Sequence, residues 1–333
     1  MSTASAHRFE ADQSDEILAS EVESGCWGLG NTATEAAYGA ARAPATCGEL
    51  AQGAFNGVLA MVTLPIDRFA VANVKLTKGR GRVSGTPNTA KATQAVRQAL
   101  LTLRRSDLDA QLSLQSPIPR GKGFGSSTAD VAAAIGATYA ALGLSASPCQ
   151  IAEIALSIEP SDGVMYPGIA LFDHLEGRIA RTLGLPPPMQ VLALEFIGTI
   201  ETIAFNKAQR TFGGLHRLDQ PVALIEAGLR SCDPALIGRG ATECALAHQE
   251  VIAKPQLEAA IAIGADAGAV GVNVAHSGTL VGILFADGTD INLRIAWAAA
   301  QAQERLVDLV DTHQHRLIGG GIWQQALGGA LPE

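Results

Sequence analysis

The residues best suited to chemistry in this chain lie in one glycine-rich stretch, residues 119–128. Glycine lets the main chain turn sharply and approach a ligand closely, because no Cβ intervenes. An alanine-rich helix is expected directly afterwards, and the first N–H groups of a helix attract anions. The stretch therefore predicts a phosphate-binding loop, with an ordinary turn capped by a serine as the alternative. Its members are Pro119, Arg120, Gly121, Lys122, Gly123, Phe124, Gly125, Ser126, Ser127 and Thr128.

Two familiar phosphate motifs do not fit this loop. A Walker A loop places Ser or Thr directly after its lysine, but Gly123 follows Lys122. The dinucleotide fingerprint requires a different glycine spacing and an acidic residue about twenty positions further on. The pattern that remains is Pro, three residues, then Gly-x-Gly-Ser-Ser-x-Ala.

That pattern resembles the phosphate loop of the GHMP kinases, and two further segments resemble the L-threonine kinase branch of that superfamily. They are Pro44-Ala45-Thr46-Cys47-Gly48-Glu49-Leu50 and Ala275-His276-Ser277-Gly278-Thr279. The first segment lacks the lysine that the superfamily carries there. The resemblance implies an α+β, two-lobe fold, with an N-terminal lobe like domain 2 of ribosomal protein S5 and an α/β-sandwich C-terminal lobe.

A kinase of this kind needs a cation between the phosphates and a group that manages the proton of the acceptor. The Ser127 hydroxyl is a suitable oxygen ligand for Mg²⁺. The resemblance implies Glu153 as the carboxylate ligand, with Glu159 as its competitor and a solvated helix glutamate as the alternative. It also implies Asp162 as the catalytic residue, although an aspartate before a glycine is a common turn former.

Four residues are predicted to contact the substrate. Glu49 either contacts the nucleotide or substrate or caps a turn. His276, Ser277 and Gly278 lie where the family closes a glycine-containing loop over the phosphates and substrate, and a bystander histidine is the alternative.

The resemblance implies an ATP- and Mg²⁺-dependent kinase that phosphorylates the hydroxyl of L-threonine or a similar amino alcohol. In the family, O-phospho-L-threonine supplies the aminopropanol arm of cobalamin. A kinase for homoserine or another small alcohol is the second hypothesis. A catalytically silent ligand sensor on the same fold is the third.

Length and patterning indicate which elements position these residues. At 333 residues, the chain exceeds what one hydrophobic core usually organises, so two lobes are expected. We predict a flexible extension over residues 1–40, an ATP-binding lobe over 41–186 and a second lobe over 187–325. The boundary falls at the Gly-Leu-Pro-Pro-Pro-Met linker, residues 184–189.

Periodicity predicts the elements around the site. A strand over residues 110–116 leads into the glycine loop, and a helix over 126–142 follows it. A capping box at Ser147 begins the next helix, strands are expected at 190–197, 199–205, 268–275 and 279–285, and a long helix at 290–313.

Composition excludes several classes of protein. A net charge of −8 argues against a nucleic-acid binder or a protein of anionic membranes. The five cysteines form no CxxC pair, so free thiols and a cytoplasmic location are expected.

Overall fold

Two long antiparallel strands, β1 (Ala36–Phe55) and β2 (Val58–Lys78), form the centre of the sheet in this computed structural model. The structure describes residues 36–198, 217–250, 252–276 and 278–329. Asn56 and Gly57 join the two strands with φ of 51° and 76°. An Asn-Gly pair with both φ values positive is the tight hairpin turn that matches the twist of the strands it connects.

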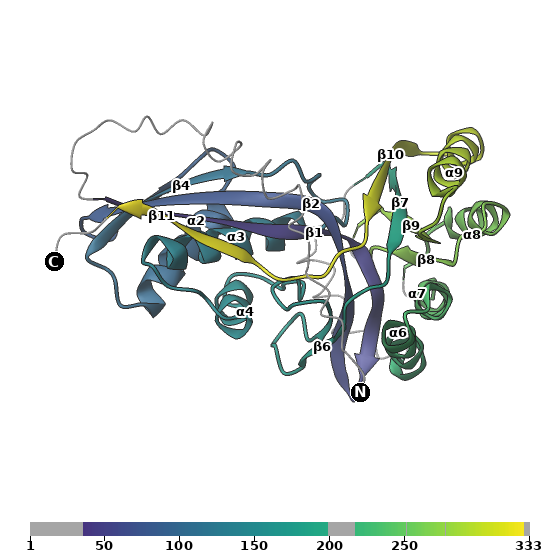
Figure 1. The fold of residues 1–333 in the computed structure, drawn as a ribbon, viewed down its shortest axis with the longest axis horizontal. Helices are drawn as coiled ribbons and strands as arrows, with labels where there is room; N and C mark the ends of the chain where they lie inside the picture. The colour runs from purple at the N-terminus through teal and green to yellow at the C-terminus, as the bar shows by residue number, and fades with distance from the viewer. Residues whose placement is uncertain (1–35, 199–216, 251, 277, 330–333) are drawn as a thin grey trace, which may run out of the picture. The chain divides into compact units, whose positions relative to one another are not determined.

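Within the part of the chain that the structure describes, the other strands extend this pair into one eleven-stranded sheet (Figure 1). The order across it is β10, β7, β9, β8, β1, β2, β4, β3, while β11 pairs with β1 and β5 pairs with β2 and β6. The strands are β3 (Val83–Gly85), β4 (Leu108–Gln115), β5 (Ile169–Phe172), β6 (Ala180–Gly184), β7 (Met189–Phe196), β8 (Gly271–Val274), β9 (Val281–Ala286), β10 (Leu309–Arg316) and β11 (Trp323–Gly329).

The helices fall into two groups along the sheet. In Figure 1, α2, α3 and α4 lie along one part of the β1–β2 pair, α7, α8 and α9 lie by β7, β8 and β9, and α6 lies beside α7 near the hairpin end of β1 and β2. The bounds are α2 (Ala90–Thr102), α3 (Ser126–Ala141), α4 (Pro148–Leu156), α6 (Asp219–Ser231), α7 (Pro234–His248), α8 (Leu257–Asp266) and α9 (Ile291–Arg305). No described helix is long and apolar enough to cross a membrane.

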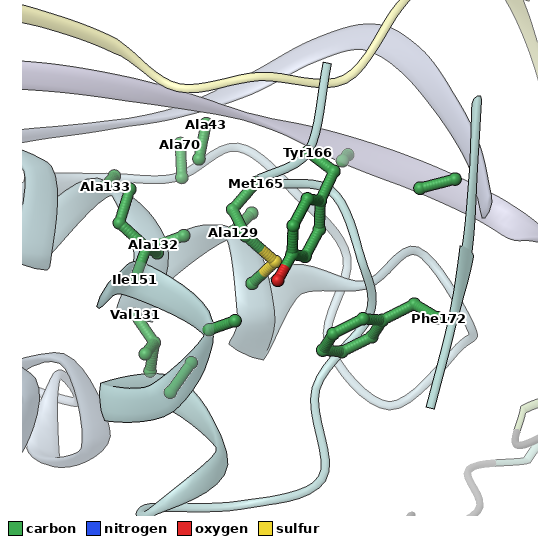
Figure 2. Packing of buried hydrophobic residues seen from close by; sticks show 14 of the residues in the cluster. Ala43, Ala70, Ala129, Val131, Ala132, Ala133, Ile151, Met165, Tyr166 and Phe172 are labelled. Atoms are coloured by element: carbon green, nitrogen blue, oxygen red, sulfur yellow. The ribbon is translucent and has the colours of Figure 1, made fainter. Parts of the chain in front are cut away.

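Helix α3 is the most extensively buried of the described helices, because its small side chains let it approach the sheet closely. A Cβ added to Gly39 of β1 would lie 2.2 Å from the main-chain nitrogen of Ala141. Figure 2 shows Ala132 and Ala133 of α3 beside Ala43 of β1 and Ala70 of β2, all in one core cluster. Every residue of α3 is buried except Ser127.

The α+β class is confirmed, and most elements lie where periodicity placed them. The predicted 290–313 helix is wrong at its end: α9 stops at Arg305, Asp308 adopts a φ of 66°, and β10 pairs with β7. The strand predicted at 199–205 lies outside the described residues. The capping box at Ser147 is confirmed by reciprocal bonds with Gln150.

The predicted domain boundaries stay predictions, with two structural facts bearing on them. β1 begins at Ala36, so residues 36–40 of the predicted extension are strand, and residues 1–35 lie outside the described residues. The sheet and the larger core both continue past residue 186, while a second core cluster is built only from residues beyond it. Four cysteines, Cys47, Cys149, Cys232 and Cys244, are free thiols.

Candidate active site

The glycine loop turns sharply into helix α3, as its composition predicts. Gly121, Gly123 and Gly125 have φ of 71°, 109° and 64°, values that side chains disfavour. Gly125 is the N-cap residue of α3 and supplies no side-chain cap. The alternative of a turn capped by Ser126 is therefore not what the structure shows, and the start of α3 keeps the polarity that attracts an anion.

Strand β1 holds the loop through the main chain. The N–H groups of Thr46 and Gly48 donate to the carbonyl oxygens of Phe124 and Gly123, at 3.0 and 2.9 Å. The register of β1 against β2 shifts repeatedly between Pro44 and Ala51, which frees these groups from the regular ladder. Such irregularities redirect main-chain and side-chain groups beside functional sites.

The side chains of the loop act mainly as anchors. Lys122 Nζ donates to the carbonyl of Phe196 at 2.8 Å and lies 3.2 Å from the Glu195 carboxylate. The Arg120 guanidinium pairs with Asp130 at 3.1 Å, and Phe124 is buried against His313. Thr128 accepts the N–H of Asp162 at 3.1 Å. Pro119 is half-buried. Direct contacts of these residues with a nucleotide stay predictions.

Ser127 faces a buried carboxylate and a lysine. Its hydroxyl donates a short hydrogen bond to Glu159 Oε1, and Glu159 is 7% exposed. Lys91 Nζ lies 2.5 Å from Glu159 Oε2 and 3.3 Å from Ser127 Oγ. The start of α3 therefore brings together the Lys91 ammonium and two oxygen atoms that could bind a metal ion, from the Ser127 hydroxyl and the Glu159 carboxylate.

Glu159 is the carboxylate that accepts the hydrogen bond of Ser127. Which of Glu153 and Glu159 binds Mg²⁺ stays a prediction. Glu153 is exposed on α4, where its charge contributes to the raised pKa values of Tyr139 and Tyr166. The neighbouring residues Ile151, Ala152, Ile154 and Ala155 are the ones that α4 buries. Glu153 therefore lies on the solvent side of a helix whose other side packs inward.

Asp162 lies directly against the N-cap of α3. A Cβ added to Gly125 would lie 2.6 Å from Asp162 Oδ2 and 2.6 Å from the Thr46 hydroxyl. Burial and the nearby carboxylates of Glu49 and Glu159 raise the pKa of Asp162 to about 7, and the Thr46 hydroxyl opposes that rise. A carboxyl group that titrates near neutral pH is suited to accept a proton there.

Glu49 and His276 form a buried pair at the point where β1 meets β8. The carboxylate of Glu49 accepts from the N–H of His276 at 3.0 Å and lies 3.0 Å from His276 Nδ1. Burial raises the pKa of Glu49 to about 7, while the His276 N–H and the charge of Lys254 oppose the rise. A packed histidine is one of the alternatives for His276, and the structure shows His276 buried against Glu49. Contact of either residue with a nucleotide or substrate stays a prediction.

The loop after β8 packs onto the phosphate loop. The N–H groups of Thr279 and Leu280 donate to the carbonyl of Lys122 at 3.0 and 3.2 Å. Gly278 has a φ of 146°, and a Cβ added there would lie 2.4 Å from that same carbonyl oxygen. The buried Lys254 Nζ donates to the Gly278 carbonyl. Ser277 lies outside the described residues.

Sequence reasoning missed three residues: Lys91, Glu195 and Lys254. Each reaches the site through partners distant in the chain, such as Lys91 with Glu159, 68 positions apart. No local spacing pattern marks such residues, and only a family alignment or the fold itself would identify them.

Among the described residues, no group of three or more His, Cys, Asp or Glu side chains is placed to hold a metal ion. Mg²⁺ needs no such cage, because it commonly takes one or two protein oxygens and completes its shell with water and substrate phosphates. The buried Glu159 carboxylate and the Ser127 hydroxyl fit that description.

Comparison with known proteins decides the family. Residues 89–170 match the family described as GHMP kinases N terminal domain. An L-threonine kinase of Salmonella typhimurium is 30% identical over 247 residues, which are 73% of this chain and 82% of the relative. The chain belongs to the GHMP kinases.

Two further similarities extend over more of this GHMP kinase. An L-threonine kinase of Citrobacter freundii is 28% identical over 285 residues, covering 85% of this chain and 98% of the relative. The crystal structure of homoserine kinase from Cytophaga hutchinsonii aligns with a TM-score of 0.65 and 17% identity, covering 89% of this chain and 99% of that one. The latter similarity shows the shared fold and confirms the predicted GHMP kinase architecture.

Proposed function

We propose that this GHMP kinase transfers the γ-phosphoryl group of ATP to the side-chain hydroxyl of L-threonine. The observation that carries the proposal is the carboxylate of Asp162 beside the N-cap of α3, next to Ser127 and Glu159. Phosphate binding at that helix start brings a phosphoryl group to a carboxylate that titrates near neutral pH. The two relatives named L-threonine kinases support the choice of acceptor.

Asp162 is the proposed acceptor of the proton. The threonine hydroxyl oxygen forms a bond to the γ-phosphorus while the bond to the β-phosphate oxygen breaks, which gives ADP and O-phospho-L-threonine. The hydroxyl proton passes to the Asp162 carboxylate. In the loose transition state of such transfers, orientation of the hydroxyl contributes more than early removal of its proton.

Ser127 and Glu159 are the proposed protein ligands of Mg²⁺. When bound, the ion offsets negative charge on the phosphates as the phosphoryl group moves. Glu159 is buried and already accepts a hydrogen bond from Ser127, so both oxygens are held in place before any ligand arrives. The amides at the start of α3 complete the proposed phosphate contacts.

Glu49, His276, Ser277 and Gly278 are the proposed substrate-side residues. Glu49 is hydrogen-bonded to His276, which belongs to the loop that packs on Lys122 and Gly123, and the charge of Glu49 acts on Asp162. This places a buried acidic group near the proposed acceptor position. A role for the product in cobalamin assembly and a cytoplasmic location stay predictions.

The test is turnover by the purified protein with ATP and Mg²⁺ on a panel of L-threonine, L-serine, L-homoserine and ethanolamine. We expect ADP release to be fastest with L-threonine, and mass spectrometry to show O-phospho-L-threonine. Faster turnover on homoserine or another alcohol would contradict the substrate while keeping the kinase. ATP binding without ADP release on any acceptor would favour a silent sensor.

A further inference from the structure

Lys91 stands at the second position of helix α2, with its ammonium between the two proposed magnesium ligands. Its Nζ lies 2.5 Å from Glu159 Oε2 and 3.3 Å from Ser127 Oγ. The side chain of Lys91 is 48% exposed, whereas that of Glu159 is 6% exposed. The lysine therefore reaches from the surface into the site.

The position of Lys91 is unfavourable for its own helix. The first turn of a helix carries partial positive charge and stabilises acidic side chains, and α2 has no acidic residue there. A lysine at that point needs an anion nearby to offset the repulsion. Glu159 is such an anion in the protein without nucleotide.

The charges around Lys91 change when a nucleotide binds. The carboxylates of Glu49 and Glu159 both act on Asp162, so negative charge gathers in this part of the site. A magnesium ion held by Ser127 and Glu159 would offset the charge of the Glu159 carboxylate and displace the ammonium. The nearest new anion at the start of α3 is then the phosphate chain, and a half-exposed lysine has the freedom to turn toward it.

We propose that Lys91 binds the γ-phosphate of ATP, and that in the nucleotide-free protein its ammonium stands in the cation position at Ser127 and Glu159. The inference rests on the proposed kinase function, and it adds a phosphate-binding residue that no sequence motif marks. The ligand chemistry is a terminal phosphate, so Lys91 distinguishes nucleoside triphosphate from diphosphate.

The test measures affinity by calorimetry, in the presence of Mg²⁺, for a non-hydrolysable ATP analogue and for ADP. The variants are Lys91→Met, Lys91→Arg and the matched control Arg97→Met, which removes an exposed cation from the same helix. Methionine and arginine are good helix formers, so α2 is retained.

We expect Lys91→Met to lower the affinity for the ATP analogue by about 30-fold, the order expected for the loss of one charge-assisted contact. The affinity for ADP should fall by less than about twofold. Lys91→Arg should recover most of the loss, and Arg97→Met should change neither affinity. Equal losses for both nucleotides, or no loss for either, would overturn the assignment. If the wild-type protein binds neither nucleotide, the proposed function itself fails.

Thermal melting with Mg²⁺ alone tests the second part of the inference. With the competing ammonium gone, Lys91→Met should gain a larger rise in melting temperature from Mg²⁺ than wild type does. The same rise in both proteins would show that Lys91 does not stand in the cation position.

Discussion

The Asp162 carboxylate is buried in the candidate active site, close to the carboxylates of Glu49 and Glu159. Burial favours the protonated form of a carboxyl group, and neighbouring negative charge favours it further. Both effects raise the pKa of Asp162 to about 7, with burial the larger cause and Glu49 the next. Because only the ionised form accepts a proton, the reaction should depend on pH around neutrality.

The first prediction concerns that pH dependence. Below about pH 7 Asp162 is protonated, so kcat/KM for L-threonine should rise as pH increases through this value. Glu49→Gln removes one source of repulsion and should move the rise to lower pH by up to about one unit. The profile is measured from pH 5.5 to 9, with Asp162→Asn as the control that loses turnover but keeps ATP affinity. An unmoved profile in Glu49→Gln would contradict the coupling.

The second prediction separates the two glutamates considered as magnesium ligands. Glu159→Gln should raise the Mg²⁺ concentration for half-maximal activity by about 10-fold or more, because it removes a charged, buried oxygen beside Ser127. Glu153→Gln changes an exposed side chain of α4 and is the matched control. The measurement is initial rate against free Mg²⁺ at saturating ATP. A larger effect from Glu153→Gln would restore the sequence-based choice.

At the scale of elements, the phosphate loop is held between β1 and the loop that follows β8. Gly123 sits at this contact, and a Cβ added there would lie 2.3 Å from Ala275 Cβ. Main-chain bonds from Thr46, Gly48, Thr279 and Leu280 fix the same few residues. The loop is therefore shaped by elements from both ends of the chain.

The third prediction tests that close packing. Gly123→Ala should lower the free energy of unfolding by more than about 3 kcal/mol, since it combines a positive φ with a steric clash. Gly57→Ala has a similar positive φ of 76° but meets nothing within 4 Å, so it should cost only about 1–2 kcal/mol. Urea unfolding of both variants gives the comparison. Equal losses of unfolding free energy in the two variants would show that the close contact with Ala275 does not contribute to the cost of Gly123→Ala.

The fourth prediction concerns the anchor between the loop and β7. Glu195→Gln removes the carboxylate 3.2 Å from Lys122 Nζ and should raise KM for ATP about 5-fold, which corresponds to about 1 kcal/mol. KM for L-threonine should change much less. Asp311→Asn, an exposed carboxylate 3.8 Å from His313 on β10, is the matched control. If the KM values for ATP and L-threonine rise together, Glu195 stabilises the fold in general and does not specifically position the glycine loop through Lys122.

On the scale of the whole molecule, the site lies where the two halves of the sheet join. Glu49 of β1 pairs with Val274 of β8, and His276 follows two residues later. The Asn273 side chain donates to the carbonyl of Cys47 at 2.6 Å across the same junction. Residues separated by more than 200 positions thus meet beside Asp162.

The chain's own pattern accounts for part of this arrangement. The glycines before Ser126 predict the loop, and the apolar run after Ser126 predicts α3. Both predictions succeed because the conformations of this loop and this helix are set by residues adjacent in the sequence. Glu153 lies on the exposed side of α4, whereas Glu159 follows the end of that helix and meets Ser127 through a tertiary contact, which local spacing does not show. Lys91, Glu195 and Lys254 depend on tertiary pairing, so no motif identified them. The end of α9 was missed for the same reason, since pairing with β7 makes residues 309–316 a strand.

The most direct measurement of the central claim is phosphorus NMR of the purified protein with ATP, Mg²⁺ and L-threonine. We expect the γ-phosphate signal of ATP to decline as ADP and a phosphomonoester, O-phospho-L-threonine, appear together. We also expect Asp162→Asn to slow this conversion strongly. Intact ATP, or release of inorganic phosphate without the phosphomonoester, would show that the protein is not an L-threonine kinase.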